Sequence, residues 1–335
     1  MSKQNQESSL IERGRYKLTD PETGKPARYT RVTKFADTLE DKENLIGWIA
    51  RHVVKGMADS DDLLVKAASL DVNSDRGLLD KIWNEAKRIA GGNQASDDGT
   101  LIHALTEAID RGENPRIPVK WKGHLQRYQM LIDDGPLEIV PEYIERVTCV
   151  PELGVAGTFD RLCRLKRDVT VEFPSGKVVH LKKGELVVGD VKTSKSLVYS
   201  QLKFAVQFAC YSRARHVWIP EEGDWEPLPE INQNVAFILW VPSTKTEAEI
   251  VAVDLEAGWE AALQCKRVRE MRNSKKLVQT VFAPKIDDPD SYASRIKNAS
   301  SKQELSAIYQ EANENRMWTP ELKTLGMNRL KELES

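Results

Sequence analysis

Two aspartates stand where apolar strand-like segments meet polar sequence, and both could take part in metal-assisted chemistry. Asp160 lies in the segment GTFDRL, and Asp190 lies in VVGDVKTSKS. Phosphodiester hydrolysis needs a divalent cation that neutralises phosphate charge and lowers the pKa of a water molecule. Magnesium prefers hard oxygen ligands such as carboxylates. Two aspartates on neighbouring strands would therefore suit a magnesium-dependent hydrolase.

A lysine follows the second aspartate at a spacing that would place both side chains on one face of a strand. Lys192 lies two residues beyond Asp190, so in a strand both side chains point to the same face. An ammonium group there could orient a water molecule or stabilise charge that develops on phosphorus. Taken alone, a D-x-K tripeptide is common by chance and marks a solvated strand end, so its meaning depends on the elements around it.

The surrounding pattern predicts a mixed α/β sheet flanked by helices. Alternating or continuous apolar segments predict strands, a turn at 174–177 predicts a hairpin, and apolar spacings of three and four predict helices. The predicted strands are 142–150, 154–165, 185–192, 235–241 and 248–255, with the hairpin over 168–182. The predicted helices around them are 99–112, 122–133, 199–215 and 258–276.

Composition shifts divide the chain into four predicted parts. Residues 1–28 are expected to be a polar, mobile arm, because they are rich in polar residues and turn signals. Residues 29–92 should form a helical N-terminal lobe, and residues 93–283 the α/β core, which opens with a polar loop at 93–98. Residues 284–335, after several Pro-Asp breakers, should form a small helical extension.

Four motifs in this order resemble the PD-(D/E)XK nuclease superfamily, and within it the RecB-type nuclease domains and phage recombination exonucleases. In that family a G-x-x-D strand precedes a D-x-K strand and a helix with Q-x-x-x-Y. Here these motifs end at Asp160, Lys192 and Tyr211, and an upstream histidine, His103, follows Gly99 as in the same relatives. The resemblance covers roughly residues 95–255 and implies a restriction-endonuclease-like sheet core.

The resemblance also implies roles for individual residues. His103, Asp160, Asp190 and the carbonyl of Val191 would hold Mg²⁺ or Mn²⁺, and Lys192 would be the catalytic lysine. Gln207 and Tyr211 would line the site towards DNA. A neutral imidazole is a borderline ligand, which favours manganese as an alternative to magnesium. Glu142 and Glu145 could add acids to the site, although exposed strand glutamates are the simpler interpretation.

Basic and hydroxyl side chains supply candidate DNA contacts. Lys203 and Arg215 share a four-residue spacing with Gln207 and Tyr211, and a solvated helix face is the alternative interpretation. The same alternative applies to the basic helix that also carries Arg269, Arg272, Lys275 and Lys276. The candidate contacts are Thr193, Ser194, Lys195, Lys203, Arg215, Lys266 and Arg267.

The sequence departs from the family pattern at one motif position and lacks the features of two kinds of relative. Phe159 stands where the family name has proline. Some relatives bind an iron–sulfur cluster through three grouped downstream cysteines, but only Cys265 lies downstream here, so no such cluster is expected. The four scattered cysteines (Cys149, Cys163, Cys210 and Cys265) form no CxxC pair and are expected to be buried apolar residues. No P-loop motif is present, so no helicase motor is expected.

Composition places few limits on the partners. The net charge of −2 excludes a globally basic architectural binder but not a local basic groove. No apolar stretch is long enough to span a membrane, and no signal peptide is found at the start of the sequence, so a reducing cytoplasm is expected. For a phage-encoded protein, that compartment is the bacterial host's.

The combined interpretation is a Mg²⁺- or Mn²⁺-dependent DNA exonuclease of phage recombination or repair. Its partners would be DNA and a strand-annealing recombination protein. An endonuclease or single-strand nuclease on the same core is one alternative. A catalytically inactive DNA-binding or scaffold protein is another, against which the intact set of acids and lysine argues.

Overall fold

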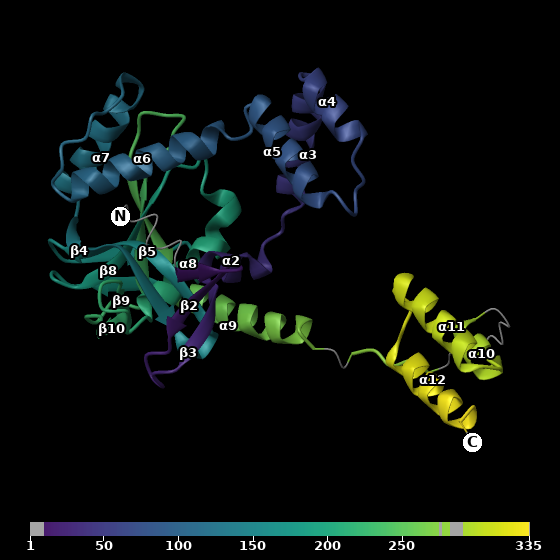
Figure 1. Ribbon diagram of the computed structural model, residues 1–335. Coiled ribbons are helices and arrows are strands. Elements are labelled where there is room, and N and C mark those ends of the chain that lie inside the picture. Colours follow the sequence, from purple (N-terminus) through teal and green to yellow (C-terminus); the bar gives the residue numbers. More distant parts are fainter. Residues whose placement is uncertain (1–9, 275–276, 282–290, 335) are drawn as a thin grey trace. The chain divides into compact units, whose positions relative to one another are not determined.

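A computed structural model describes residues 10–274, 277–281 and 291–334. These residues form two compact units that divide between Asn273 and Ser274. The first unit is a mixed α/β structure around a ten-stranded sheet, as the apolar pattern predicts (Figure 1). Among the described residues, no helix is both long and apolar enough to cross a membrane.

The sheet contains parallel and antiparallel pairs. Its main path runs β1-β2-β3-β5-β4-β9-β10, while β8 joins β5 to β11 and β11 pairs with β12. Only β3 with β5 and β8 with β11 are parallel. The strands are β1 (Ile11–Glu12), β2 (Arg15–Thr19), β3 (Pro26–Arg31), β4 (Leu137–Val150), β5 (Val155–Leu165), β8 (Leu186–Lys192), β9 (His216–Ile219), β10 (Asp224–Pro227), β11 (Val235–Trp240) and β12 (Glu249–Asp254). The predicted hairpin forms a separate pair, β6 (Val169–Glu172) and β7 (Val178–Leu181).

Strand β5 organises the sheet because it pairs with three other strands. Along one edge it pairs with β4. Along its other edge it pairs first with β3, at Val155 and Ala156, and then with β8, from Arg161 to Arg164. Residues 157–160, the G-x-x-D segment, lie between these two pairings, so Asp160 sits where β8 joins the sheet.

Helices cover both faces of the sheet. One face carries α2 (Val32–Ala36), α8 (Gln201–Ser212) and α9 (Leu255–Arg272), whose apolar residues share a core with Phe159 and Leu162. The other face carries α6 (Gln94–Asp110) and α7 (Lys122–Asp134), packed over Cys163 and Val187. All four cysteines are buried, as expected of small apolar side chains.

The polar arm predicted for residues 1–28 is wrong for residues 10–28, and residues 1–9 lie outside the described residues. Strands β2 and β3 form an antiparallel hairpin that extends the sheet. Its alternate side chains Tyr16, Leu18 and Tyr29 are buried against Trp218 and Ala156. Polar residues fill the solvent-facing positions between them, so the segment has a polar composition and a strand periodicity at the same time.

The helical lobe is present but begins later than predicted, because residues 29–31 belong to β3. Its helices are α3 (Glu43–Ala58), α4 (Asp61–Ala68) and α5 (Arg76–Ile89). The loop predicted at 93–98 is wrong from Gln94 onward, since α6 starts there. Asp97 in its first turn is favourable because acids stabilise the positive end of a helix dipole.

Two predicted boundaries downstream also change. Helix α8 ends at Ser212, so Arg215 lies beyond it rather than on its surface stripe. Helix α9 ends at Arg272, and Lys275 and Lys276 lie outside the described residues. The second unit contains α10 (Tyr292–Asn298), α11 (Lys302–Glu314) and α12 (Pro320–Glu332), as predicted for a helical extension. The predicted boundary at 284 falls outside the described residues.

Candidate metal centre

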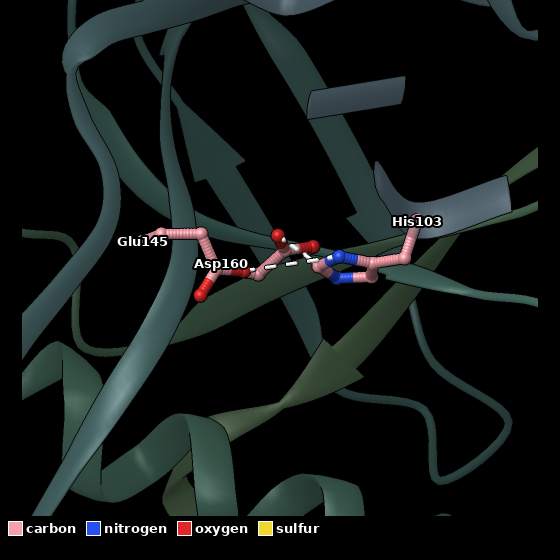
Figure 2. Close-up of side chains that lie close together, drawn as sticks. All are labelled: His103, Glu145 and Asp160. Atoms are coloured by element: carbon pink, nitrogen blue, oxygen red, sulfur yellow. Dashed lines mark ion pairs between the residues drawn. The ribbon is translucent and has the colours of Figure 1, made fainter. Parts of the chain in front are cut away.

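Three side chains that could hold a metal ion converge from α6, β4 and β5. His103 Nε2 lies 3.0 Å from Asp160 Oδ1, and His103 Nδ1 lies 3.8 Å from Glu145 Oε1. One ligand atom from each of the three residues lies within 4.8 Å of the others. Figure 2 shows the imidazole and the two carboxylates pointing toward one another from separate elements. A helix and two strands therefore contribute one oxygen or nitrogen donor each to a single point.

The sheet register explains why acids gather there. Ile144 pairs with Arg161 and Arg146 pairs with Phe159, so Glu145 lies opposite Asp160 across β4 and β5. On the other side Arg161 pairs with Gly189, and the same register places Asp190 beside Asp160. Cross-strand neighbours share a face of a sheet. Three carboxylates thus form a row across three adjacent strands, with Asp160 in the centre.

The two carboxylate oxygens of Asp160 have different surroundings. Oδ2 accepts a hydrogen bond from the backbone N–H of Val191, 2.6 Å away, and another from the guanidinium of Arg161. Oδ1 is buried and faces His103, whose Nε2 lies 3.0 Å away. Oδ1 is therefore the atom that a cation would engage.

Asp190 and Lys192 form a second part of the site. Lys192 Nζ donates to Asp190 Oδ1 at 2.5 Å, which confirms that the two side chains share a face. The ammonium also lies over the rings of Phe204 and Phe208, 5.3 and 5.7 Å from their centroids. Such cation–π contacts fix the position of a charge. Asp190, a predicted metal ligand, is thus bound to Lys192 and lies next to the three-residue group.

Burial and like charge shift the protonation of these groups in different directions. Burial raises the pKa of Glu145, and the neighbouring Asp160 adds to that effect, giving a pKa of about 8. Burial lowers the pKa of His103, but Asp160 outweighs it and brings the value to about 9. Burial also raises the pKa of Asp190 against the opposing effect of Lys192. Asp160 stays ionised because Arg161 and His103 outweigh its burial and hold its pKa well below the usual range.

Glu145 was expected to be an exposed strand glutamate, and this expectation is wrong. Its side chain is 28% exposed and points into the group, whereas Glu142 is exposed. Its backbone has a φ of +52°, which is rare for a residue with a side chain. It follows a register shift in β4 between Ile139 and Ile144. Irregular strand geometry next to a site commonly re-aims a side chain.

Two motif glycines allow close packing between the elements of the site. A Cβ at Gly157 would lie 2.8 Å from the hydroxyl of Tyr211 and 3.0 Å from Val32. A Cβ at Gly99 would lie 2.7 Å from Thr193 Oγ1, at the end of the D-x-K strand. Real Cβ atoms do not approach so closely, so a side chain at Gly157 would displace Val32 or Tyr211, whereas at Gly99 the Thr193 side chain would have to rotate. The glycines of the motifs thus set the distance of α6 and α8 from the strands.

Gln207 and Tyr211 lie inside α8 rather than along an open surface. Both are buried, and neither is among the residues that line the cavity beside the metal group. Tyr211 packs edge-on against Phe159, with ring centroids 6.3 Å apart. Their position beneath the G-x-x-D strand supports a role in holding that strand in place.

A cavity of about 1230 Å³ opens over the metal group. His103, Glu145, Val191 and Lys192 line it, together with Thr193 and Ser194 from the predicted DNA contacts. The other predicted contacts lie elsewhere. Lys203 forms an ion pair with Asp37, 2.6 Å away, and Lys266 donates a hydrogen bond to the Glu152 carbonyl. The remaining three are exposed and do not line the cavity: Lys195, Arg215 and Arg267. Arg111 and Arg146, which line the cavity, were not identified from the sequence.

Comparison with known proteins adds no family assignment. No protein-family model matches the sequence, and no curated protein matches it significantly. The resemblance to PD-(D/E)XK nucleases therefore rests on the sequence motifs alone.

The donor set and spacing of the group fit a hard divalent cation. Cis ligands of an octahedral Mg²⁺ or Mn²⁺ with bonds near ~2.1 Å are about 3 Å apart. The 3.0 Å separation of His103 Nε2 and Asp160 Oδ1 matches that spacing. The group offers two carboxylates and one imidazole, with no thiolate among them, a donor set that can hold a divalent cation.

Proposed function

We propose that this protein is a divalent-metal-dependent deoxyribonuclease. The observation that carries the proposal is the convergence of His103, Glu145 and Asp160, beside a large cavity that His103, Glu145 and Lys192 line. A bound Mg²⁺ or Mn²⁺ would neutralise phosphate charge and make a water molecule more acidic.

Each residue has a role that follows from its contacts. His103, Glu145 and Asp160 would hold the cation, and the carboxylate of Asp190 is next to them in the same row. The motif resemblance adds the carbonyl of Val191 as a further ligand. Lys192 is held by Asp190 and by the faces of two phenylalanine rings. A positive charge fixed in this way can stabilise the negative charge that develops at phosphorus, or orient the attacking water.

The cavity carries both basic and acidic side chains. Arg111 and Arg146 line it with Lys192, each arginine paired with a glutamate (Glu107 and Glu226), and Thr193 and Ser194 line it as well. Charged and hydroxyl groups of this kind contact phosphates without reading sequence. We assign the substrate as DNA and the mode as exonucleolytic, in recombination or repair, on the strength of the motif resemblance. A strand-annealing partner, a phage origin and a cytoplasmic location belong to the same proposal.

The direct test uses linear and closed circular duplex DNA with purified protein, in Mg²⁺, in Mn²⁺ and in EDTA. We expect metal-dependent loss of linear DNA, abolished by Asp160→Asn and by Lys192→Met. Glu138→Gln, which changes an exposed acid on β4, is the matched control and should leave activity intact. Cutting of closed circles would change the mode to endonucleolytic. Full activity of Asp160→Asn would refute the assignment of the site.

A further inference from the structure

A fully buried arginine lies directly behind the proposed metal ligand Asp160. Arg161 has no exposed surface, and its guanidinium contacts Asp160 on one side and Asp110 Oδ2, 2.7 Å away, on the other. Asp110 in turn accepts hydrogen bonds from the hydroxyl of Tyr128 at 2.7 and 2.8 Å. The chain Asp160–Arg161–Asp110–Tyr128 therefore runs from the site into the core between β5, α6 and α7.

Burying these charges is expensive, which argues for a purpose beyond stability. The free energy lost in removing two charges from water often exceeds their Coulombic attraction, and proteins in which apolar residues replace such a pair are commonly no less stable. Here four polar groups are joined in an apolar region that also contains Leu125 and Ile102. Arrangements of this kind persist at sites where a charged group must be held in one orientation.

We propose that Arg161 is a positioning residue for the metal site, and that Asp110 and Tyr128 fix it in that role. This inference rests on the proposed metal-dependent function. The guanidinium and the Val191 N–H both engage Oδ2 of Asp160, so only Oδ1 faces His103. Asp160 would therefore bind the cation through one oxygen. Asp110 balances the charge of Arg161, which would otherwise repel a divalent cation from the site.

The test measures Mn²⁺ affinity by isothermal titration calorimetry and by the electron paramagnetic resonance signal of free Mn²⁺. The variants are Asp110→Asn, Tyr128→Phe and Arg161→Lys, with Arg164→Gln as the control on the same strand. Arg164 is exposed and donates to the Gly184 carbonyl, away from the site. Thermal unfolding of each variant is measured in EDTA, so that a change in fold is separated from a change in the site.

We expect Asp110→Asn to weaken Mn²⁺ binding by roughly 10–100-fold, the usual effect of losing an outer partner of a metal ligand. Tyr128→Phe should weaken it less, and Arg161→Lys should retain part of the affinity because one positive charge remains. Arg164→Gln should bind as the wild type does. Tyr128→Phe keeps both ions and the aromatic ring, so it reports on the site even where Arg161→Lys fails to fold.

Two results separate this inference from the function on which it rests. If the wild-type protein binds no Mn²⁺, the proposed metal centre is refuted and the inference with it. If the wild type binds Mn²⁺ and Asp160→Asn abolishes binding, but Asp110→Asn and Tyr128→Phe bind like the wild type, the centre stands. In that case Arg161 has no positioning role.

Discussion

Glu145 lies directly opposite Asp160 across strands β4 and β5, so two acids face each other beside His103. Like charges opposite each other destabilise a strand pair. A divalent cation between them would turn that repulsion into attraction. When both are ionised, Glu145 and Asp160 therefore destabilise the folded protein without metal and stabilise it when a cation is bound.

Replacing Glu145 by Gln tests this relationship. The amide keeps the size of the side chain but removes the charge, so Mn²⁺ affinity should fall by at least the roughly 10–100-fold seen when an outer partner is lost. In EDTA above pH 8, where the Glu145 carboxylate is ionised, the variant should be no less stable than the wild type, because the repulsion with Asp160 is also removed. Calorimetric titration and thermal unfolding measure the two effects. Glu138→Gln, on the same strand, should change neither; equal Mn²⁺ affinity in the two variants would exclude Glu145 as a ligand.

The pKa values of His103 and Glu145 predict how stability without metal depends on pH. In the folded protein these pKa values are about 9 and about 8, above the unfolded values of 6.5 and 4.5. Between pH 6.5 and 8 the folded state therefore holds protons that the unfolded chain releases. The free energy of unfolding contributed by these groups is complete at low pH and falls as the pH rises through this window.

Melting temperatures in EDTA between pH 6.5 and 8.5 measure that slope. We expect a fall in the wild type and a smaller fall in Glu145→Gln and His103→Gln. Because metal binding displaces the same protons, stabilisation by saturating Mn²⁺ should grow with pH over this range. A melting temperature of the wild type that parallels those of both variants would contradict the assigned pKa shifts.

The sequence was sufficient to predict the strands that carry Asp160, Asp190 and Lys192, because residues 154–165 alternate in hydrophobicity and residues 185–192 are a short apolar segment that ends in charge. It was also sufficient to place His103 on a helix. Glu145 was named from the sequence only as a possible extra acid, alongside Glu142, because its contribution depends on a register shift and a positive φ in β4, and neither has a local signal. The register of β4 against β5 determines which glutamate of that segment faces the site.

The N-terminal hairpin was missed for a related reason. Its polar residues are real, but Tyr16, Leu18 and Tyr29 become core residues only when β3 pairs with β5. The burial of Arg161 could not be predicted from the sequence either. A basic residue in a strand suggests exposure. Arg161 is nevertheless fully buried, between Asp110 of α6 and the strand, with Tyr128 of α7 bound to Asp110.

Gly189 offers a test of packing next to Asp190. A Cβ at this position would lie 2.5 Å from the sulfur of the buried Cys163 on β5. Gly189→Ala should therefore destabilise the protein by ~1–3 kcal/mol, the usual effect of overpacking a core. Cys163→Ala removes the sulfur, and in the double variant the new methyl group occupies part of the freed space. Chemical denaturation of all three variants measures the coupling.

We expect the double variant to be less destabilised than the sum of the single changes by at least ~0.5 kcal/mol, as is common for residues in contact. Gly176→Ala is a contrasting control. That glycine has a φ of +84° and open space around it, so its substitution should be strained whether or not Cys163 is present. Strict additivity at Gly189 and Cys163 would mean that the sheet relaxes to admit the methyl group.

The two compact units have separate cores, which predicts that they unfold independently. The core of the second unit contains Ile296, Leu305 and Ile308, with Trp318 and Leu322 packed against them. All of these residues belong to α10–α12 and the segment joining them, and none comes from the first unit. Each helix begins at a side-chain cap, provided by Ser291, Ser301 and Thr319. Local caps and a local core allow a small bundle to form without the sheet.

In a chain that ends at Asn273, the free energy of unfolding of the first unit should therefore change by no more than about 0.5 kcal/mol, the range seen for changes at exposed positions. Its Mn²⁺ affinity should equal that of the full chain. In the full chain, Ile308→Ala removes a buried side chain from the small core at a cost of ~2–5 kcal/mol. Circular dichroism should then show a loss of helix with no change in the main transition. If instead the truncated chain lost metal binding, or Ile308→Ala lowered the main transition, the two units would share stability, and the second unit would contribute to the site.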